Sequence, residues 1–201
     1  FFPISHPRLR RIIMDQVPAD VTAESAGNES PAKRFVGYVI ERIAKDNGFA
    51  ARLKRADNPA TEYQSWEILA GFGIDLEKEW QRLPYCVIGA ALAKAKPASN
   101  GTITLGAAIA GCYPEGNQSE QAKARLRRLL ACTSTSEACR ILRPLLALMA
   151  SRSVTPDFAG LLNELQWFSG SSRERIRARW AQEFYRRAGE AAGSEARNSH
   201  D

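Results

Sequence analysis

The sequence has little of what most active sites require. Its two histidines, His6 and His200, lie in segments that we expect to be tails. This scarcity excludes histidine-based acid–base catalysis and most histidine metal sites. The chain also has no G-x-x-x-x-G-K-[ST] phosphate loop and no G-x-S-x-G hydrolase turn. Acidic residues in the second half are too sparse for a nuclease that gathers carboxylates around a divalent ion. We therefore expect no enzymatic activity, no catalytic residue, no cofactor and no metal site.

Cysteine is scarce as well, and long apolar runs are absent. The four cysteines, Cys86, Cys112, Cys132 and Cys139, have spacings that match no zinc site. We expect them to be buried free thiols in a reducing compartment. No run approaches the roughly 20 apolar residues that a membrane span needs. These features predict a cytoplasmic protein without a membrane partner.

The chain also lacks the apolar–polar alternation that is typical of β-strands, and helical stripes recur instead. Residues that are typical of helix starts support this interpretation: Ser30-Pro31, Thr61 with Gln64, Asn117 with Glu120, Ser136 alone, and Ser171 with Glu174. The predicted fold class is all-α, with about eight or nine helices in two packed bundles.

The loop "PASNGT" at 97–102 is the best candidate for a boundary between two halves. The predicted units are a poorly ordered segment at 1–31, an N-terminal helical bundle at 32–98, a C-terminal basic helical bundle at 99–188 and a flexible tail at 189–201. The four tryptophans fit apolar stripes and are expected in the core: Trp66, Trp80, Trp167 and Trp180. No aromatic residue lies clearly among the outward-facing cations, so base stacking is not predicted.

Positive charge is concentrated in the C-terminal third. The net charge of the whole chain is +6, yet residues 122–188 hold thirteen Lys and Arg against five Asp and Glu. Twelve of these thirteen cations are arginine, whose planar guanidinium binds phosphate oxygens in pairs. Such asymmetry favours a polyanionic partner, most often a nucleic acid.

The cations form four groups, each backed by an apolar stripe that fixes its direction. Rigid helices that present arginines in this way bind the phosphate backbone rather than the bases. The residues predicted to bind nucleic acid are Arg52, Lys54 and Arg55; Lys123, Arg125 and Arg128; Arg140 and Arg143; and Arg173, Arg175, Arg177, Arg179 and Arg186.

The last group lies in "SSRERIRARWAQEFYRRA", residues 171–188, which has six arginines in eighteen positions. Ile176, Trp180 and Phe184 make one apolar stripe, while Arg175, Arg179 and Arg186 fall within about 40° of one another on a helix. Glu174 and Glu183 lie outside that row. The row is either a solvated helix face, which is common, or a surface that holds phosphates, and this helix alone does not decide between them.

The order of these segments resembles the CasB family, the small subunit of the type I-E CRISPR surveillance complex Cascade. The resemblance covers about Arg34 to Ala188. It rests on a series of degenerate motifs in a specific order: "ARLKRA", "YCVIGAALAKAKP", "TLGAAIAG", "KARLRRLLAC", "LRPLL", "DFAGLLNELQWF" and "RIRARWAQEFYRR". The family often has arginine where this chain has Ala107 and Pro144, so contacts at these two positions are not expected here.

The resemblance implies an all-helical, non-catalytic subunit of two bundles. Family members pair as two copies along the crRNA–DNA duplex, and their basic faces hold the displaced non-target strand and so stabilise the R-loop. The implied partners are the large and backbone subunits of Cascade, crRNA, target DNA and a second copy of the chain. Two alternatives remain open: a sequence-specific, repressor-like DNA-binding protein, and a purely structural scaffold subunit.

Overall fold

The computed structural model describes residues 29–198, and it describes side chains as far as residue 186. Nine α-helices and two short 3-10 turns follow one another within these residues, and the single β-type pairing there is a bridge between Ile103 and Pro156. The all-α prediction is confirmed. The elements are α1 (Pro31–Lys45), α2 (Asn47–Arg55), η1 (Glu62–Ser65), α3 (Trp66–Gly71), α4 (Glu79–Ala95), α5 (Leu105–Gly111), η2 (Gly116–Gln118), α6 (Glu120–Leu130), α7 (Thr135–Ser151), α8 (Phe158–Gln166) and α9 (Gly170–Asn198).

The predicted terminal segments fall largely outside this range. Of the segment predicted to be poorly ordered, residues 1–28 lie outside the described residues, and α1 begins at Pro31. At the other end, α9 continues through Asn198, past the predicted start of the tail at residue 189. Residues 199–201 lie outside the described part.

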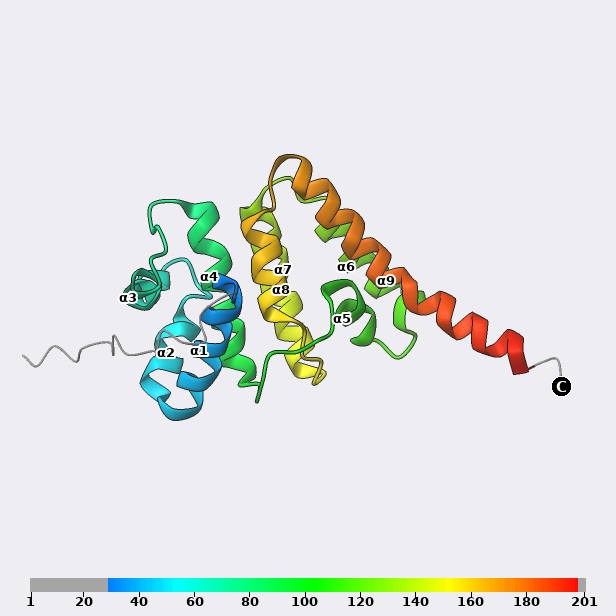
Figure 1. Ribbon diagram of the computed structural model, residues 1–201, viewed down its shortest axis with the longest axis horizontal. Helices are drawn as coiled ribbons and strands as arrows, with labels where there is room; N and C mark the ends of the chain where they lie inside the picture. The colour runs from blue at the N-terminus through cyan, green and yellow to red at the C-terminus, as the bar shows by residue number, and fades with distance from the viewer. Residues whose placement is uncertain (1–28, 199–201) are drawn as a thin grey trace, which may run out of the picture.

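The helices are arranged in a row of three groups (Figure 1). Helices α1 to α4 lie at one side, α7 and α8 in the middle, and α5, α6 and α9 at the other side. Helix α4 packs along α7, α1 and α4 both contact α8, and α5 lies against α9. The buried side chains of all three groups belong to one continuous hydrophobic core. The proposed division into bundles at 32–98 and 99–188 stays a prediction.

Helix α4 is apolar around nearly its whole circumference because it lies at the centre of this arrangement. Residues that point in different directions around this helix are all buried, among them Cys86, Val87, Ile88 and Ala90. A helix without a polar face must be covered on every side, and α4 is covered by α1, α2, α7 and α8.

Helix starts confirm some of the predicted caps and correct others. Ser30 caps α1 and Pro31 occupies its first turn, as predicted. The cap of α7 is Ser134 rather than Ser136, because the Ser134 hydroxyl accepts the N–H of Glu137 at 3.2 Å. The cap of α6 is likewise Ser119 rather than Asn117. In each case a second polar residue two positions away offered the same local pattern.

The other two predicted capping boxes are wrong. Thr61 makes no capping bond, and its hydroxyl donates to the carbonyl oxygen of Arg55 at 2.8 Å. Helix α9 begins at Gly170, ahead of Ser171. The Glu174 carboxylate pairs with arginine side chains instead of a backbone N–H at the helix start.

The segment between α4 and α5 is fastened to the start of α8. The Asn100 side-chain oxygen accepts the N–H groups of Phe158 at 2.9 Å and Ala159 at 3.3 Å. Its amide nitrogen donates to Asp157, the N-cap residue of α8, at 2.7 Å. The Asp157 N–H donates to the carbonyl oxygen of Ile103 at 2.8 Å. The segment predicted as a loop boundary therefore supplies part of the cap of α8.

Three of the four tryptophans are not in the core. Trp180 is fully buried, but Trp66, Trp80 and Trp167 keep 37%, 51% and 64% of their surface exposed. Each of these three tryptophans lies at or next to the end of a helix. The apolar stripe there is short, and no neighbouring element covers it. The prediction that all four are core residues is therefore wrong for these three.

The four cysteines are buried free thiols, as predicted. Burial raises the pKa of Cys86 to about 12 and that of Cys139 to about 12. Both thiols therefore stay protonated at neutral pH, and neither has the reactivity of a thiolate.

Candidate nucleic-acid interface

Helix α9 presents its arginine row to solvent. Arg175, Arg179 and Arg186 are all exposed. Ile176, Trp180 and Phe184 on the same helix are buried. Helix α9 lies close against α5, since backbone atoms of Trp180 and Phe184 approach Gly106. The predicted separation of an apolar stripe from a cationic row is therefore what the structure shows.

One acid reaches this row from another helix. The Glu164 carboxylate of α8 lies 3.1 Å from the Arg179 guanidinium, and it also accepts the indole N–H of Trp180 at 2.6 Å. Burial raises the pKa of the Glu164 carboxyl, and the Trp180 hydrogen bond and the Arg179 charge act against that increase. Sequence spacing within α9 gave no sign of this partner, because it lies 15 residues earlier in the chain.

The other two predicted cations of α9 are half-buried and engaged. Arg173 donates to the carbonyl oxygen of Thr133 at 2.5 Å, in the turn between α6 and α7. Arg177 pairs with Glu174 at 3.1 Å. Arg173 thus ties the start of α9 to that turn, whereas the Arg177 pair lies within α9 itself. Both side chains still keep more than a quarter of their surface exposed.

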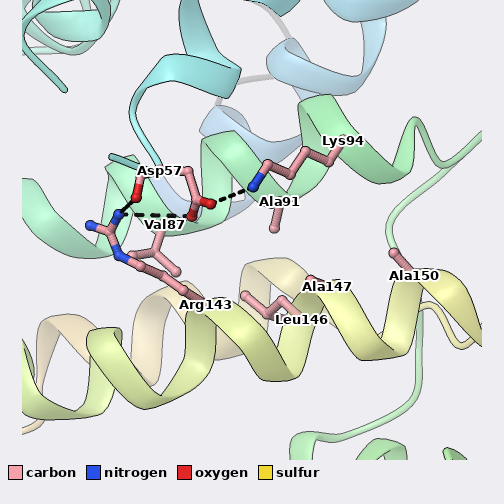
Figure 2. Close-up of a pocket in the computed structure, with 8 residues that line it drawn as sticks. All are labelled: Asp57, Val87, Ala91, Lys94, Arg143, Leu146, Ala147 and Ala150. Atoms are coloured by element: carbon pink, nitrogen blue, oxygen red, sulfur yellow. Dashed lines mark hydrogen bonds and ion pairs between the residues drawn. The ribbon is translucent and has the colours of Figure 1, made fainter. Parts of the chain in front are cut away.

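The two predicted cations of α7 have different environments. Arg143 donates to the carbonyl oxygens of Ala56 and Asp57 at the end of α2, and its guanidinium lies 3.7 Å from the Asp57 carboxylate. Figure 2 shows that the same carboxylate also meets Lys94 of α4. Arg143 is thus a link between α2, α4 and α7, and it has few free donors for a phosphate.

Arg140, one turn earlier, is exposed. Burial raises the pKa of the Cys132 thiol in the turn between α6 and α7, and Glu137 raises it further, while the charges of Arg140 and of Arg177 on α9 act in the opposite direction. The start of α9 is joined to the same turn, since Arg173 donates to the carbonyl oxygen of Thr133.

The α2 cations lie apart from the α9 row. Figure 1 shows α2 and α9 on opposite sides of the central helices. Lys54 and Arg55 are exposed, and Arg55 donates to the side chain of Gln64. Arg52 is half-buried, and its Nε atom has no hydrogen-bond partner among the described residues.

The α6 cations are partly neutralised. Lys123 pairs with Glu120 at 2.8 Å, and Arg125 donates to the Tyr113 hydroxyl at 2.5 Å. Arg128 is exposed, and no described carboxylate lies within ion-pair distance of it. Arg125, by contrast, is half-buried. The four predicted groups therefore form no single continuous patch.

A groove that the sequence did not indicate lies beside Arg140. It has a volume of about 570 Å³, within the range of roughly 300–1,000 Å³ that is typical of ligand pockets. We call it the aromatic groove. Its main lining residues are Tyr63, Trp66, Arg82, Leu83, Cys139 and Arg140. It was missed because Trp66 was assigned to the core and because its walls come from η1, α3, α4 and α7.

No group of three or more His, Cys, Asp or Glu side chains within residues 29–186 is placed to hold a metal ion. No helix in this part of the chain is long and apolar enough to cross a bilayer.

Comparison with known proteins gives one family and one fold. The model of the family "CRISPR-associated protein Cse2" matches residues 50–185, more than half of the chain. No curated protein sequence matches the chain. Among solved structures, a chain of a CRISPR RNA-guided surveillance complex is similar, with a TM-score of 0.64 and 18% identity over 82% of this chain and 96% of that one. CasB from M. ruber is also similar, with a TM-score of 0.63 and 23% identity over 83% of this chain and 98% of that one.

Proposed function

Because the chain belongs to the CRISPR-associated Cse2 family, also called CasB, whose members are small subunits of type I-E Cascade, we propose that it is a non-catalytic subunit that binds nucleic-acid backbone. Its ligands are the displaced non-target strand and the crRNA–DNA duplex, and its task is to stabilise the R-loop. Its partners are the large and backbone subunits, crRNA, target DNA and a second copy of itself, and its compartment is the cytoplasm.

The observation that carries this proposal is the set of exposed arginines on α9 and α7. Arg175 and Arg186 on α9 and Arg140 on α7 are exposed, and no described carboxylate forms an ion pair with them. Arg175 donates to the Ser172 hydroxyl at 3.0 Å, but a guanidinium without an acidic partner keeps donors that can bind phosphate oxygens bidentately. Since the exchange of duplexes in an R-loop is nearly balanced in free energy, a few such contacts are enough to shift it.

The remaining predicted cations support the proposal to different degrees. Lys54, Arg55 and Arg128 are exposed on other helices. Arg179 keeps 57% of its side chain exposed beside Glu164. Arg52, Lys123, Arg125, Arg143, Arg173 and Arg177 are half-buried. We assign the direct phosphate contacts to the exposed group and a mainly positioning role to Arg143.

The test compares two double variants of equal charge. Arg175→Ala/Arg186→Ala removes two exposed cations from α9, and Arg34→Ala/Lys45→Ala removes two exposed cations from α1. Binding of target DNA by the assembled complex is measured over a salt series, with circular dichroism as the folding control. We expect the α9 variant alone to lower the slope of log K against log salt by roughly 0.7 to 0.9 for each lost contact.

The outcome also separates the alternatives. Target sequence should not change the effect, because backbone contacts carry no base information. An effect that depends on base sequence would favour a repressor-like protein. An unchanged salt slope and an unchanged R-loop in the α9 variant would mean that the arginine row is only a solvated face, and the chain would then be a structural subunit.

A further inference from the structure

The aromatic groove has two exposed aromatic rings on one wall. Tyr63 of η1 keeps 59% of its surface exposed, and Trp66 of α3 keeps 37%. Arg82 lies over the Trp66 ring, with its guanidinium carbon 5.4 Å from the ring centroid. Arg82 is itself fixed by Glu62 at 2.6 Å and by the carbonyl oxygen of Leu76. The indole is therefore held in one orientation instead of being free to turn away.

The lining of the aromatic groove is balanced in charge. Glu62 is neutralised by Arg82. Asp57 lies between Arg143 and Lys94. The remaining charged residues of the lining are Arg140 and Glu79, which have opposite charges. Glu79 accepts a hydrogen bond from Ser136 at 3.3 Å. An uncharged planar group suits such a groove better than a phosphate does, because the lining offers aromatic and apolar surface and no net positive charge.

The aromatic groove adjoins the proposed phosphate-binding surface. Arg140 of α7 lines the groove, and Arg173 at the start of α9 donates to the carbonyl oxygen of Thr133 in the turn that precedes α7. A strand whose phosphates follow the α7 and α9 arginines therefore passes the mouth of the groove. A displaced strand is unpaired, so its bases are free to turn out of the backbone path.

We propose that the aromatic groove stacks an unpaired base of the displaced strand against Tyr63 and Trp66 while Arg140 holds an adjoining phosphate. This inference rests on the proposed function and adds a ligand group to it, the base itself. Stacking of this kind tolerates every base because each has a flat π surface. It therefore adds affinity for single strands without adding sequence specificity.

The test uses two single strands that differ only in their bases. One is an oligothymidine of about 12 nucleotides, within the usual range for single-strand sites, and the other is an abasic strand with the same phosphates. Binding of each to the full chain is measured by fluorescence anisotropy at low salt. The variants are Tyr63→Ala/Trp66→Ala, Tyr63→Phe, which keeps the aromatic ring, and Trp167→Ala, which removes an exposed tryptophan outside the groove.

We expect the unmodified chain to bind the oligothymidine more tightly than the abasic strand. The double alanine variant should lose about 5- to 140-fold in affinity for the oligothymidine, the effect of one lost stacked base. Its affinity for the abasic strand should not change. Tyr63→Phe and Trp167→Ala should bind both strands as the unmodified chain does. A strand with a central 2-aminopurine should lose fluorescence on binding to the unmodified chain, and this readout needs no variant.

The possible failures are distinguishable. Equal, salt-sensitive affinity for both strands, or 2-aminopurine fluorescence that does not fall, would overturn base stacking while leaving the backbone-binding function intact. The aromatic groove would then be a surface for a protein partner. No binding of either strand would overturn both proposals.

Discussion

Trp180 joins the hydrophobic core to the arginine surface. It is fully buried, and its ring stacks on Phe168 with 5.3 Å between centroids and 14° between planes. Its indole N–H donates to Glu164, which in turn pairs with the exposed Arg179. One side chain therefore fixes both the position of α9 and the direction of an arginine on its outer face.

Replacing Trp180 with alanine should destabilise the chain by about 3–5 kcal/mol, because it removes a large buried side chain and leaves a cavity. Urea unfolding followed by circular dichroism measures the change. The control is Trp167→Ala, which removes the same side chain from a position that is 64% exposed and should stay within about 0.5 kcal/mol. Similar losses in the two variants would contradict the assignment of Trp180 to the core.

Glu164→Gln should gain stability relative to the unmodified chain as the pH rises. Burial raises the pKa of the Glu164 carboxyl, so the folded chain holds this proton more tightly than the unfolded chain does. The contribution of Glu164 to stability therefore falls as the pH rises from the ordinary carboxyl range through the raised pKa. Glutamine cannot ionise and escapes this loss, while its oxygen still accepts the Trp180 N–H.

Thermal unfolding of both proteins is measured from about pH 4 to about pH 7. The difference in stability between the two proteins at each pH removes the contributions of groups that titrate alike in both. A constant difference would show that the Trp180 hydrogen bond and the Arg179 charge offset the burial of Glu164. A difference that favours glutamate at the higher pH would show that they outweigh it.

Sequence reasoning identified Trp180 as a core residue but was wrong about three other tryptophans. Trp180 repeats with Ile176 and Phe184 over two helical turns, and such a stripe requires a partner. Trp66 begins α3, Trp80 lies in the first turn of α4 and Trp167 ends α8. A position at the end of a helix gives no periodicity to judge by, so exposure there depends on which elements lie nearby in space.

At the scale of elements, the contact between α5 and α9 depends on Gly106. A Cβ atom at this position would lie 2.2 Å from the carbonyl oxygen of Trp180 and 2.6 Å from the backbone nitrogen of Phe184. Both atoms belong to the backbone of α9, which cannot give way as a flexible side chain can. The absence of a side chain therefore sets the spacing of the two helices.

Gly106→Ala should consequently destabilise the fold by about 1–3 kcal/mol or more, the usual cost of overpacking. Gly111→Ala at the other end of α5 is the matched control, since its nearest neighbour would be Val154 at 4.0 Å. It should be neutral or slightly stabilising, because alanine favours a helix more than glycine does. Melting temperatures of the two variants test the comparison, and equal melting temperatures would exclude a close contact at Gly106.

Helix positions were more predictable than helix starts. The stripe of α1 and the cap at Ser30 follow from local rules. Ser134 and Ser136 are equally good caps by those rules, and the choice depends on where the preceding turn leaves the chain. Glu174 had two possible partners, a backbone N–H and the neighbouring arginines, and the arginines were closer once α9 began at Gly170.

At the scale of the whole molecule, the buried side chains of both predicted bundles form one core. Helix α4 of the first packs along α7 of the second, and Arg143 ties the end of α2 to α7. We expect a single cooperative unfolding transition, with equal calorimetric and van't Hoff enthalpies. Differential scanning calorimetry measures both, and two separate transitions would show that the bundles are independent domains.

The distribution of charge in the sequence predicted a basic surface. The apolar stripe of α9 predicted which face of that helix carries the arginines. It did not predict which arginines have partners. Glu164 meets Arg179, and the end of α2 meets Arg143, across long separations in the chain. Periodicity reports only the direction of a side chain on its own helix, so pairings between helices and the walls of the aromatic groove required the structure.

The docking of Asn100 onto the start of α8 has a consequence for the kinetics of folding. Asn100 and Asp157 are 57 residues apart, and closing a loop of that length in an unstructured chain costs on the order of 3–4 kcal/mol in entropy. Helices α5, α6 and α7 lie within the loop, and their formation shortens the distance to be closed. We therefore expect the Asn100 bonds to form late on the folding path. A late contact changes the rate of unfolding more than the rate of folding, so we expect Asn100 to act mainly on the lifetime of the native state.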